Sequence, residues 1–184
     1  KRLLNIDAEE EGVLYIGCAG GVDTVASKTI NTEPCSGDAL QLSITGLKGG
    51  HSGLDIHKNR GNAIRLLATV LYTLTAADIP VQICTISGGS KRNAIPREAN
   101  ARIIVPNGDE AINLLEKQRA HLHALHADSE PNLMLSIGTV ENTSACDTAT
   151  SLSIIRYLFS APLGIISLSQ TIPDLVETST NIGV

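Results

Sequence analysis

His51 is the side chain whose sequence neighbours best suit it to chemistry. It lies between Gly49-Gly50 and Ser52-Gly53, so little side-chain bulk surrounds it and its ring can project from a turn. An imidazole can donate a hydrogen bond or transfer a proton near neutral pH. Exposed histidines and glycine-rich turns also occur without any catalytic role, so the loop by itself leaves both interpretations open.

Two further positions carry polar groups where a ligand could bind. Asp7 ends the short apolar run at 3–6, and a carboxylate at the end of a strand can either bind a metal ion or cap a turn. Arg92 and Asn93 follow a Gly-Gly turn and precede Pro96. They are either a polar clamp for a substrate or part of a loop whose exit is fixed by the proline.

Composition excludes several classes of protein. The chain has 184 residues, a net charge of -5 and 2% aromatic residues, which disfavours a nucleic-acid partner because phosphate binding needs clustered Lys and Arg. No apolar run reaches the length of about 18 residues that a membrane span requires, so we expect no membrane association. The four cysteines form no C-x-x-C pair, which favours reduced thiols in a cytoplasmic protein.

The middle of the chain alternates between two hydrophobic periods. Period-two or β-branched runs predict strands at about 40–44, 81–86, 99–105 and 133–140, and period-3.6 patterns predict helices from Asn62 to Asp78 and from about Asp109 onwards. The order β-α-β-β-α-β is typical of a ferredoxin-like α+β fold, an antiparallel sheet with two helices on one face. We therefore predict such a core at about 39–140.

The two ends are expected to be additions to this core. Apolar runs at 3–7 and 13–16 predict two strands joined by an acidic loop, and the C-terminal extension has a helical pattern at about 152–159 and a strand at 164–168. The sequence does not begin with Met, which favours a segment excised from a longer chain.

Five ordered motifs carry a resemblance to a known family. They are NIDAEEEG at 5–12, YIGCAGG at 15–21, GLKGGHSGLDIH at 46–57, RNAIPREA at 92–99 and VETSTNIGV at 176–184. Together they resemble the bacterial aminoacyl-histidine dipeptidases, the peptidase D or carnosinase-like group of dinuclear zinc metallopeptidases. In that family a ferredoxin-like lid is inserted into a catalytic domain that binds two metal ions.

The resemblance implies a division of the chain and a set of roles. Residues 1–21 would be the end of a catalytic-domain segment and residues 22–184 the lid and dimerisation domain. Asp7 would be a metal ligand, His51 would polarise the scissile carbonyl across a homodimer, and Asn93 and Arg92 would contact the dipeptide substrate. Two zinc ions per active site are implied for the complete enzyme, and the chain alone would be inactive.

One departure from the family pattern concerns the substrate's carboxylate. Many relatives have an Asp-x-Arg clamp after the loop at 92–96, whereas this chain has Arg-Ile-Ile-Val-Pro at 102–106. Arg92 and Arg97 are then the candidates for this contact. The alternative to a metallopeptidase is a non-catalytic ferredoxin-like module that pairs subunits or binds a small effector.

Overall fold

A computed structural model describes residues 11–14, 19–141 and 143–184 of the chain. The central elements are β2 (Asp38–Thr45), α1 (Ala63–Ala76), β4 (Gln82–Gly88), β6 (Ala99–Val105), α2 (Gly108–His126), β7 (Met134–Val140) and α3 (Thr148–Ser160). The shorter elements are β1 (Glu33–Pro34), β3 (Gly50–His51), the 3-10 turn η1 (Ile56–Lys58), β5 (Ala94–Ile95), β8 (Ser144–Ala145), β9 (Gly164–Leu168) and β10 (Val176–Thr180).

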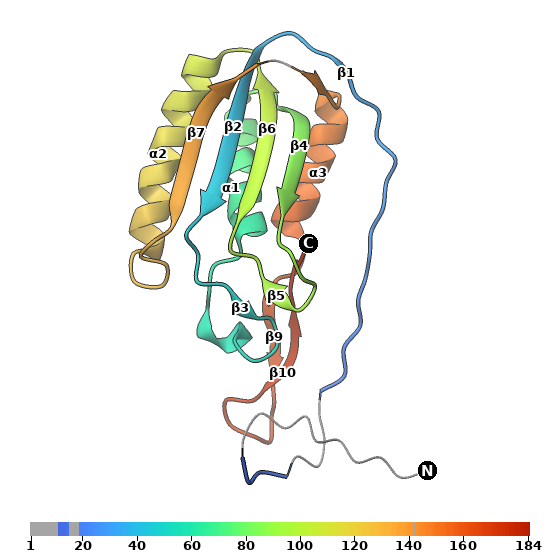
Figure 1. Ribbon diagram of the computed structural model, residues 1–184, viewed down its shortest axis with the longest axis vertical. Coiled ribbons are helices and arrows are strands. Elements are labelled where there is room, and N and C mark those ends of the chain that lie inside the picture. Colours follow the sequence, from blue (N-terminus) through green and yellow to red (C-terminus); the bar gives the residue numbers. More distant parts are fainter. Residues whose placement is uncertain (1–10, 15–18, 142) are drawn as a thin grey trace.

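The central sheet has the strand order β4-β6-β2-β7, and all neighbouring strands are antiparallel. Strands β2 and β4, joined by α1, therefore run parallel with β6 between them. Strands β6 and β7, joined by α2, likewise run parallel on either side of β2. Two interlocked split βαβ units result, which confirms the predicted β-α-β-β-α-β arrangement and its α+β class (Figure 1).

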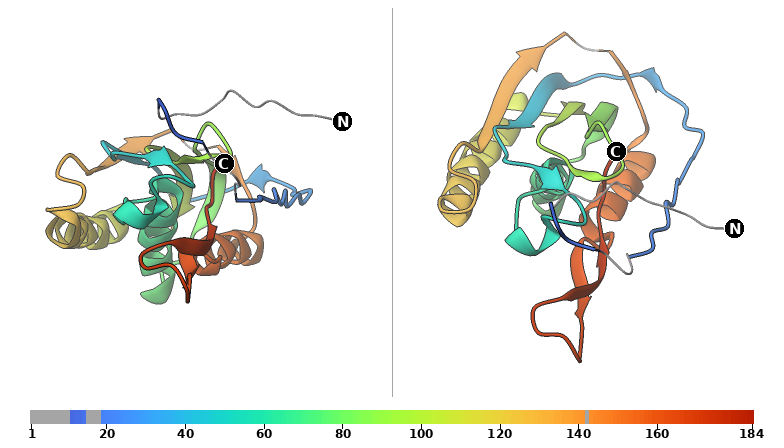
Figure 2. Two further views of the ribbon diagram at one scale, coloured as in Figure 1. Left: turned by 90° about the horizontal axis from the view of Figure 1, so that it is seen from below. Right: turned by 60° about the horizontal axis from the view of Figure 1, so that its bottom comes forward.

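The period-two pattern of β2 determines which face of the sheet is covered. Leu40, Leu42 and Ile44 are completely buried, because alternate side chains of a strand point to the same face. They pack in one core with Leu67 and Leu71 of α1. The helices α1, α2 and α3 line this face, as the views in Figures 1 and 2 agree.

Helix α1 begins where the sequence predicts. The side chain of Asn62 accepts a hydrogen bond from the backbone N–H of Arg65, which caps the first turn. Helix α2 has an equivalent cap directly before its acidic first turn, at Asn107, whose side chain accepts from the N–H of Glu110. Helix α3 is capped by Asp147.

Helix α3 shares the core of the central domain. Ile155 is fully buried in the same apolar cluster as α1. The guanidinium of Arg65 donates to the carbonyls of Phe159 and Ala161 at the end of α3, where the helix dipole favours a cation. Tyr72 and Phe159 stack with ring centroids 4.2 Å apart. The third helix thus completes the helical layer beside α1.

Strands β3, β5, β9 and β10 gather at one end of the sheet, whereas the short strands β1 and β8 pair with each other away from them. Strands β3 and β5 pair with each other, as do β9 and β10, and both ladders lie beyond the ends of β2 and β6 (Figure 1). The predicted strand at 3–7 lies outside the described residues. So does part of the one at 13–16, whose described members Val13 and Leu14 are not in a strand. No helix in the described part of the chain has the length and apolarity to span a membrane.

Candidate functional site

The short ladder of β3 and β5 brings two distant loops together. His51 lies opposite Ala94 in this ladder, and the N–H of Ser52 donates to the carbonyl of Asn93 at 2.9 Å. The predicted catalytic residue His51 and the predicted substrate contacts Arg92 and Asn93 are therefore neighbours. Their proximity was not evident from the spacing of the residues along the chain.

The backbone before His51 requires glycine. Gly49 and Gly50 have φ values of +60° and +150°, which other residues rarely adopt. A Cβ atom on Gly50 would lie 2.2 Å from Nη1 of Arg60 and 2.6 Å from Oδ2 of Asp55. Gly50 thus allows the charged pair of Asp55 and Arg60 to lie against the loop that carries His51, whereas Gly49 makes room for the side chain of Arg97.

Asp55 and Arg60 hold the loop by hydrogen bonds to its backbone. Oδ2 of Asp55 accepts the backbone N–H of His51 at 2.9 Å and lies 3.3 Å from Nη1 of Arg60, which also donates to the carbonyl of Gly49. The hydrogen bond from Lys58, the N–H of His51 and the charges of Arg60 and Lys58 lower the pKa of the Asp55 carboxyl from 3.8 to about 2. Asp55 is therefore an anion at neutral pH.

The hydrogen bonds of the His51 ring assign its tautomer. Nδ1 accepts the backbone N–H groups of Gly53 and Leu54, each at 3.1 Å. A ring nitrogen that accepts hydrogen bonds carries no proton, so in the neutral imidazole the proton is on Nε2. His51 is exposed. Its Nε2–H can therefore donate a hydrogen bond to an oxygen outside this chain.

Two supports of the loop were not found from the sequence. Asn181, in the C-terminal motif, donates to the carbonyl of Ala94 at 2.8 Å and accepts from the amide of Asn62 at 3.2 Å. Glu130 is 2% exposed and accepts the N–H groups of Lys48 and Gly61. Glu130 belongs to no motif, so nothing in its sequence context could have identified it.

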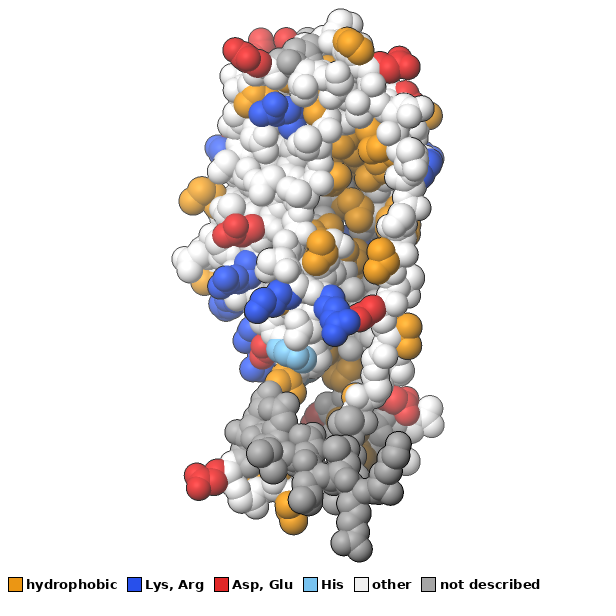
Figure 3. All heavy atoms as spheres, turned by 45° about the vertical axis from the view of Figure 1, so that its right-hand side comes forward, with side chains coloured by type: hydrophobic (Ala, Val, Ile, Leu, Met, Phe, Trp, Pro, Cys, Tyr) orange, Lys and Arg blue, Asp and Glu red, His pale blue; other side chains and the backbone are white. Residues whose placement is uncertain are grey.

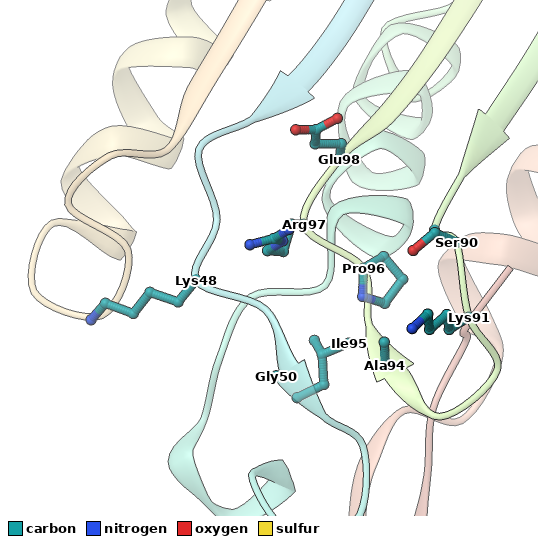
Figure 4. Close-up of a pocket in the computed structure, with 10 residues that line it drawn as sticks. Lys48, Gly50, Ser90, Lys91, Ala94, Ile95, Pro96, Arg97 and Glu98 are labelled. Atoms are coloured by element: carbon teal, nitrogen blue, oxygen red, sulfur yellow. The ribbon is translucent and has the colours of Figure 1, made fainter.

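Positive side chains surround the edge of this loop pair (Figure 3). A pocket of about 480 Å³ lies between the β2–β3 loop and the segment 89–98. Lys91, Arg97 and Glu98 line it, and Figure 4 shows Lys48, at its rim, with its side chain turned away from the other labelled residues. Such a volume is in the range of small-molecule sites, and its basic residues favour an anionic group.

Arg92 has a carboxylate partner within the chain. Its Nη1 lies 2.5 Å from Oδ2 of Asp23, and both side chains are mostly exposed. Neither Lys91 nor Arg97 makes an ion pair with a carboxylate in the parts of the chain that the structure describes. Lys91 and Arg97 are therefore better suited than Arg92 to bind the carboxylate of a ligand.

The predicted metal ligand Asp7 lies outside the described residues. Within residues 11–14, 19–141 and 143–184, no group of three or more His, Cys, Asp or Glu side chains could hold a metal ion. The described residues therefore do not by themselves fit the zinc centre that the sequence resemblance implies.

Comparison with known proteins gives consistent matches. A family model of the peptidase dimerisation domain, M20_dimer, matches residues 42–128. The chain is 40% identical over 187 residues to the cytosol non-specific dipeptidase of Escherichia coli strain K12, covering 99% of this chain and 38% of that protein. The crystal structure of the aminoacylhistidine dipeptidase from Vibrio alginolyticus matches with a TM-score of 0.76 and 32% identity, over 84% of this chain and 32% of that one.

The matched segment contains the two loops of the candidate site. It runs from β2 to the end of α2 and includes the His51 loop, Arg92 and Asn93. The chain spans 32–38% of the length of the two dipeptidases, and the resemblance that its motifs predict is confirmed. Residues 42–128 therefore form a peptidase dimerisation domain of the M20 type, in a chain that is similar to dipeptidases along almost its whole length.

Proposed function

We propose that this chain is the lid and dimerisation domain of a cytoplasmic metallodipeptidase that hydrolyses Xaa-His dipeptides of the carnosine type. The observation that carries the proposal is the His51 loop, where two glycines present an exposed imidazole with its Nε2–H free to donate. The similarity to two dipeptidases supports the same reading. A non-catalytic dimerisation module would have no need for a fixed tautomer at an exposed tip.

In this proposal His51 acts on the carbonyl group of the scissile peptide bond. Its Nε2–H donates to the carbonyl oxygen, and the hydrogen bond strengthens as negative charge develops on that oxygen in the transition state. The N–H groups of Gly53 and Leu54 hold the ring and Asp55 holds the backbone N–H of His51 before substrate arrives, so no reorganisation is needed. Asn93, whose carbonyl accepts the N–H of Ser52, is the residue that we assign to the substrate backbone.

The metal centre belongs to the complete protein in this proposal. Two zinc ions would supply an acidified water as nucleophile. Asp7 is the ligand that we assign to this chain from its sequence motif, and the other ligands lie in parts of the dipeptidase length that the chain does not span. The residues that the structure describes act on the substrate alone.

The basic pocket provides the contact for the substrate's carboxylate. Arg97 can form a bidentate pair with a carboxylate, and Lys91 adds a second positive charge in the same pocket. Arg92 stays a proposed substrate contact on the adjacent loop, with Asp23 as its carboxylate partner within the chain.

Hydrolysis assays test the proposed activity. We expect no turnover of carnosine or another Xaa-His dipeptide by the 184-residue chain with added zinc, because the described residues form no metal site. The complete dipeptidase should hydrolyse the same substrates, measured as release of histidine. Robust turnover by the chain alone would refute the assignment as a lid, and a complete protein without any dipeptidase activity would favour the effector-binding module.

Replacement of His51 by alanine tests its catalytic role. In the complete enzyme His51→Ala should lower kcat by about 100- to 1000-fold, the loss typical of removing one oxyanion donor. The zinc content, measured by elemental analysis, should stay unchanged. The matched control is His123→Ala, which removes an exposed imidazole from α2 and should leave kcat as it is. An unchanged kcat in His51→Ala would remove this residue from the mechanism.

Replacement of Arg97 tests the carboxylate subsite. Arg97→Ala should raise KM about tenfold or more, because a hydrogen bond to a charged group contributes about 1.5–3 kcal/mol. Arg119→Ala, which removes a partly exposed guanidinium of α2 that pairs with Glu116, serves as the control and should leave KM unchanged. If both variants keep the parent KM, the substrate's carboxylate binds elsewhere.

The domain's role in assembly predicts a homodimer. Strand β7 is an outer strand of the described sheet, and Leu125 of α2 and Met134 of β7 are exposed to 66% and 55%, so we assign the contact surface to this edge. Light scattering after size exclusion should give about twice the 19.3 kDa of one chain. Leu125→Asp should shift the mass towards the monomer, whereas Leu168→Asp on β9 should not. A strictly monomeric parent chain at high concentration would refute this assignment.

A further inference from the structure

Glu130 is a buried carboxylate without a cationic partner among the described residues. It lies in the connection between α2 and β7, with 2% of its surface exposed. None of the ion pairs of the described chain includes it. Burying a charged group is costly unless hydrogen bonds compensate, so a carboxylate at this position indicates a specific set of donors.

Two backbone N–H groups supply those hydrogen bonds. Oε2 of Glu130 accepts from Lys48 at 2.8 Å, and Oε1 accepts from Gly61 at 2.7 Å. The main chain of Glu130 is itself fixed. Its N–H donates to the carbonyl of His126 at 2.8 Å, and its carbonyl accepts the N–H of Leu133 at 3.0 Å. One side chain thus joins the β2–β3 loop and the start of α1 to the end of α2.

The hydrogen bond from the N–H of Lys48 to Glu130 fixes the backbone shortly before His51. Only Gly49 and Gly50 separate Lys48 from His51, and both have positive φ values. Glycine backbone restricts direction poorly, so the course of the loop depends on its anchors. Asp55 and Arg60 also hold the loop, but their side chains are 19% and 23% exposed. Glu130, in contrast, anchors the start of the loop to the core.

We propose that Glu130 is a positioning residue for His51, acting through the backbone of Lys48. This inference rests on the proposed catalytic role of His51. Glutamine cannot replace Glu130 without loss, because its amide carries one acceptor oxygen and one donor nitrogen. In either orientation the NH₂ group would face one of the two N–H donors, so one anchor would be broken.

The test is a double-mutant cycle in the complete dipeptidase. Glu130→Gln should lower kcat about 10- to 100-fold, the scale expected when a catalytic group is misplaced, with a smaller change in KM. In the His51→Ala background the same substitution should change kcat less than about twofold, because groups that act through one another are not additive. Glu110→Gln, on the exposed first turn of α2, is the control and should leave kcat unchanged in both backgrounds.

Each outcome decides between the two proposals. If Glu130→Gln leaves kcat unchanged, or lowers it by the same factor with and without His51, Glu130 has no positioning role while His51 keeps its own. If His51→Ala itself leaves kcat unchanged, the catalytic assignment fails and this inference fails with it.

A second variant and a second measurement guard against misfolding. Glu130→Asp keeps both acceptor oxygens with a shorter reach and should give a loss smaller than that of Glu130→Gln, again only when His51 is present. Hydrogen exchange followed by mass spectrometry should show faster exchange in residues 47–51 of Glu130→Gln than in the parent enzyme, with the sheet at 99–105 unchanged. Equal exchange at 47–51 would overturn the anchoring itself.

Discussion

The register of the central strand β2 is the constraint on which the rest of the structure depends. It is paired on both sides, with β6 and β7, and three of its side chains, Leu40, Leu42 and Ile44, are completely buried. A slip of one residue would turn these side chains to the open face of the sheet. Because β2 ends at Thr45, its register also fixes the point at which the glycine loop leaves the core. Leu47, 5% exposed, holds that first turn against the same apolar cluster.

From this point the loop is directed by polar contacts. Glu130 holds Lys48, Arg60 holds Gly49, and Asp55 holds the N–H of His51. The apolar core therefore sets the origin of the loop, charged side chains hold its backbone, and the N–H groups of Gly53 and Leu54 orient the imidazole. Apolar burial stabilises the core and polar contacts hold the loop, so a substitution that weakens one of them need not weaken the other.

The sequence predicts most of the core because each helix and strand there has its own local hydrophobic pattern. The strands and helices between 39 and 140 have clear periods, and Asn62 is a recognisable helix cap. The two-residue strands β3 and β5 have no period to detect, so the meeting of His51 with Ala94 required the structure. Glu130 could not be found from the sequence either, since its two donors are 82 and 69 residues away. The placement of α3 beside α1 depends on Arg65 and on the stacked pair Tyr72–Phe159, contacts between segments far apart in the sequence.

The exposure of the proposed site explains why it would work only against a second surface. His51, Lys91 and Arg97 are all exposed in this chain, and an ion pair formed in water at such positions contributes only about 0–1 kcal/mol. If another protein surface covers the substrate and excludes water, the same side chains act in a medium of lower dielectric constant, where their interactions are stronger. The fixed Nε2–H of His51 gains most from this change, because its orientation is already determined by Gly53 and Leu54. In the proposed function the domain would supply preorganised donors, and its closure over the substrate would supply the environment in which they become effective.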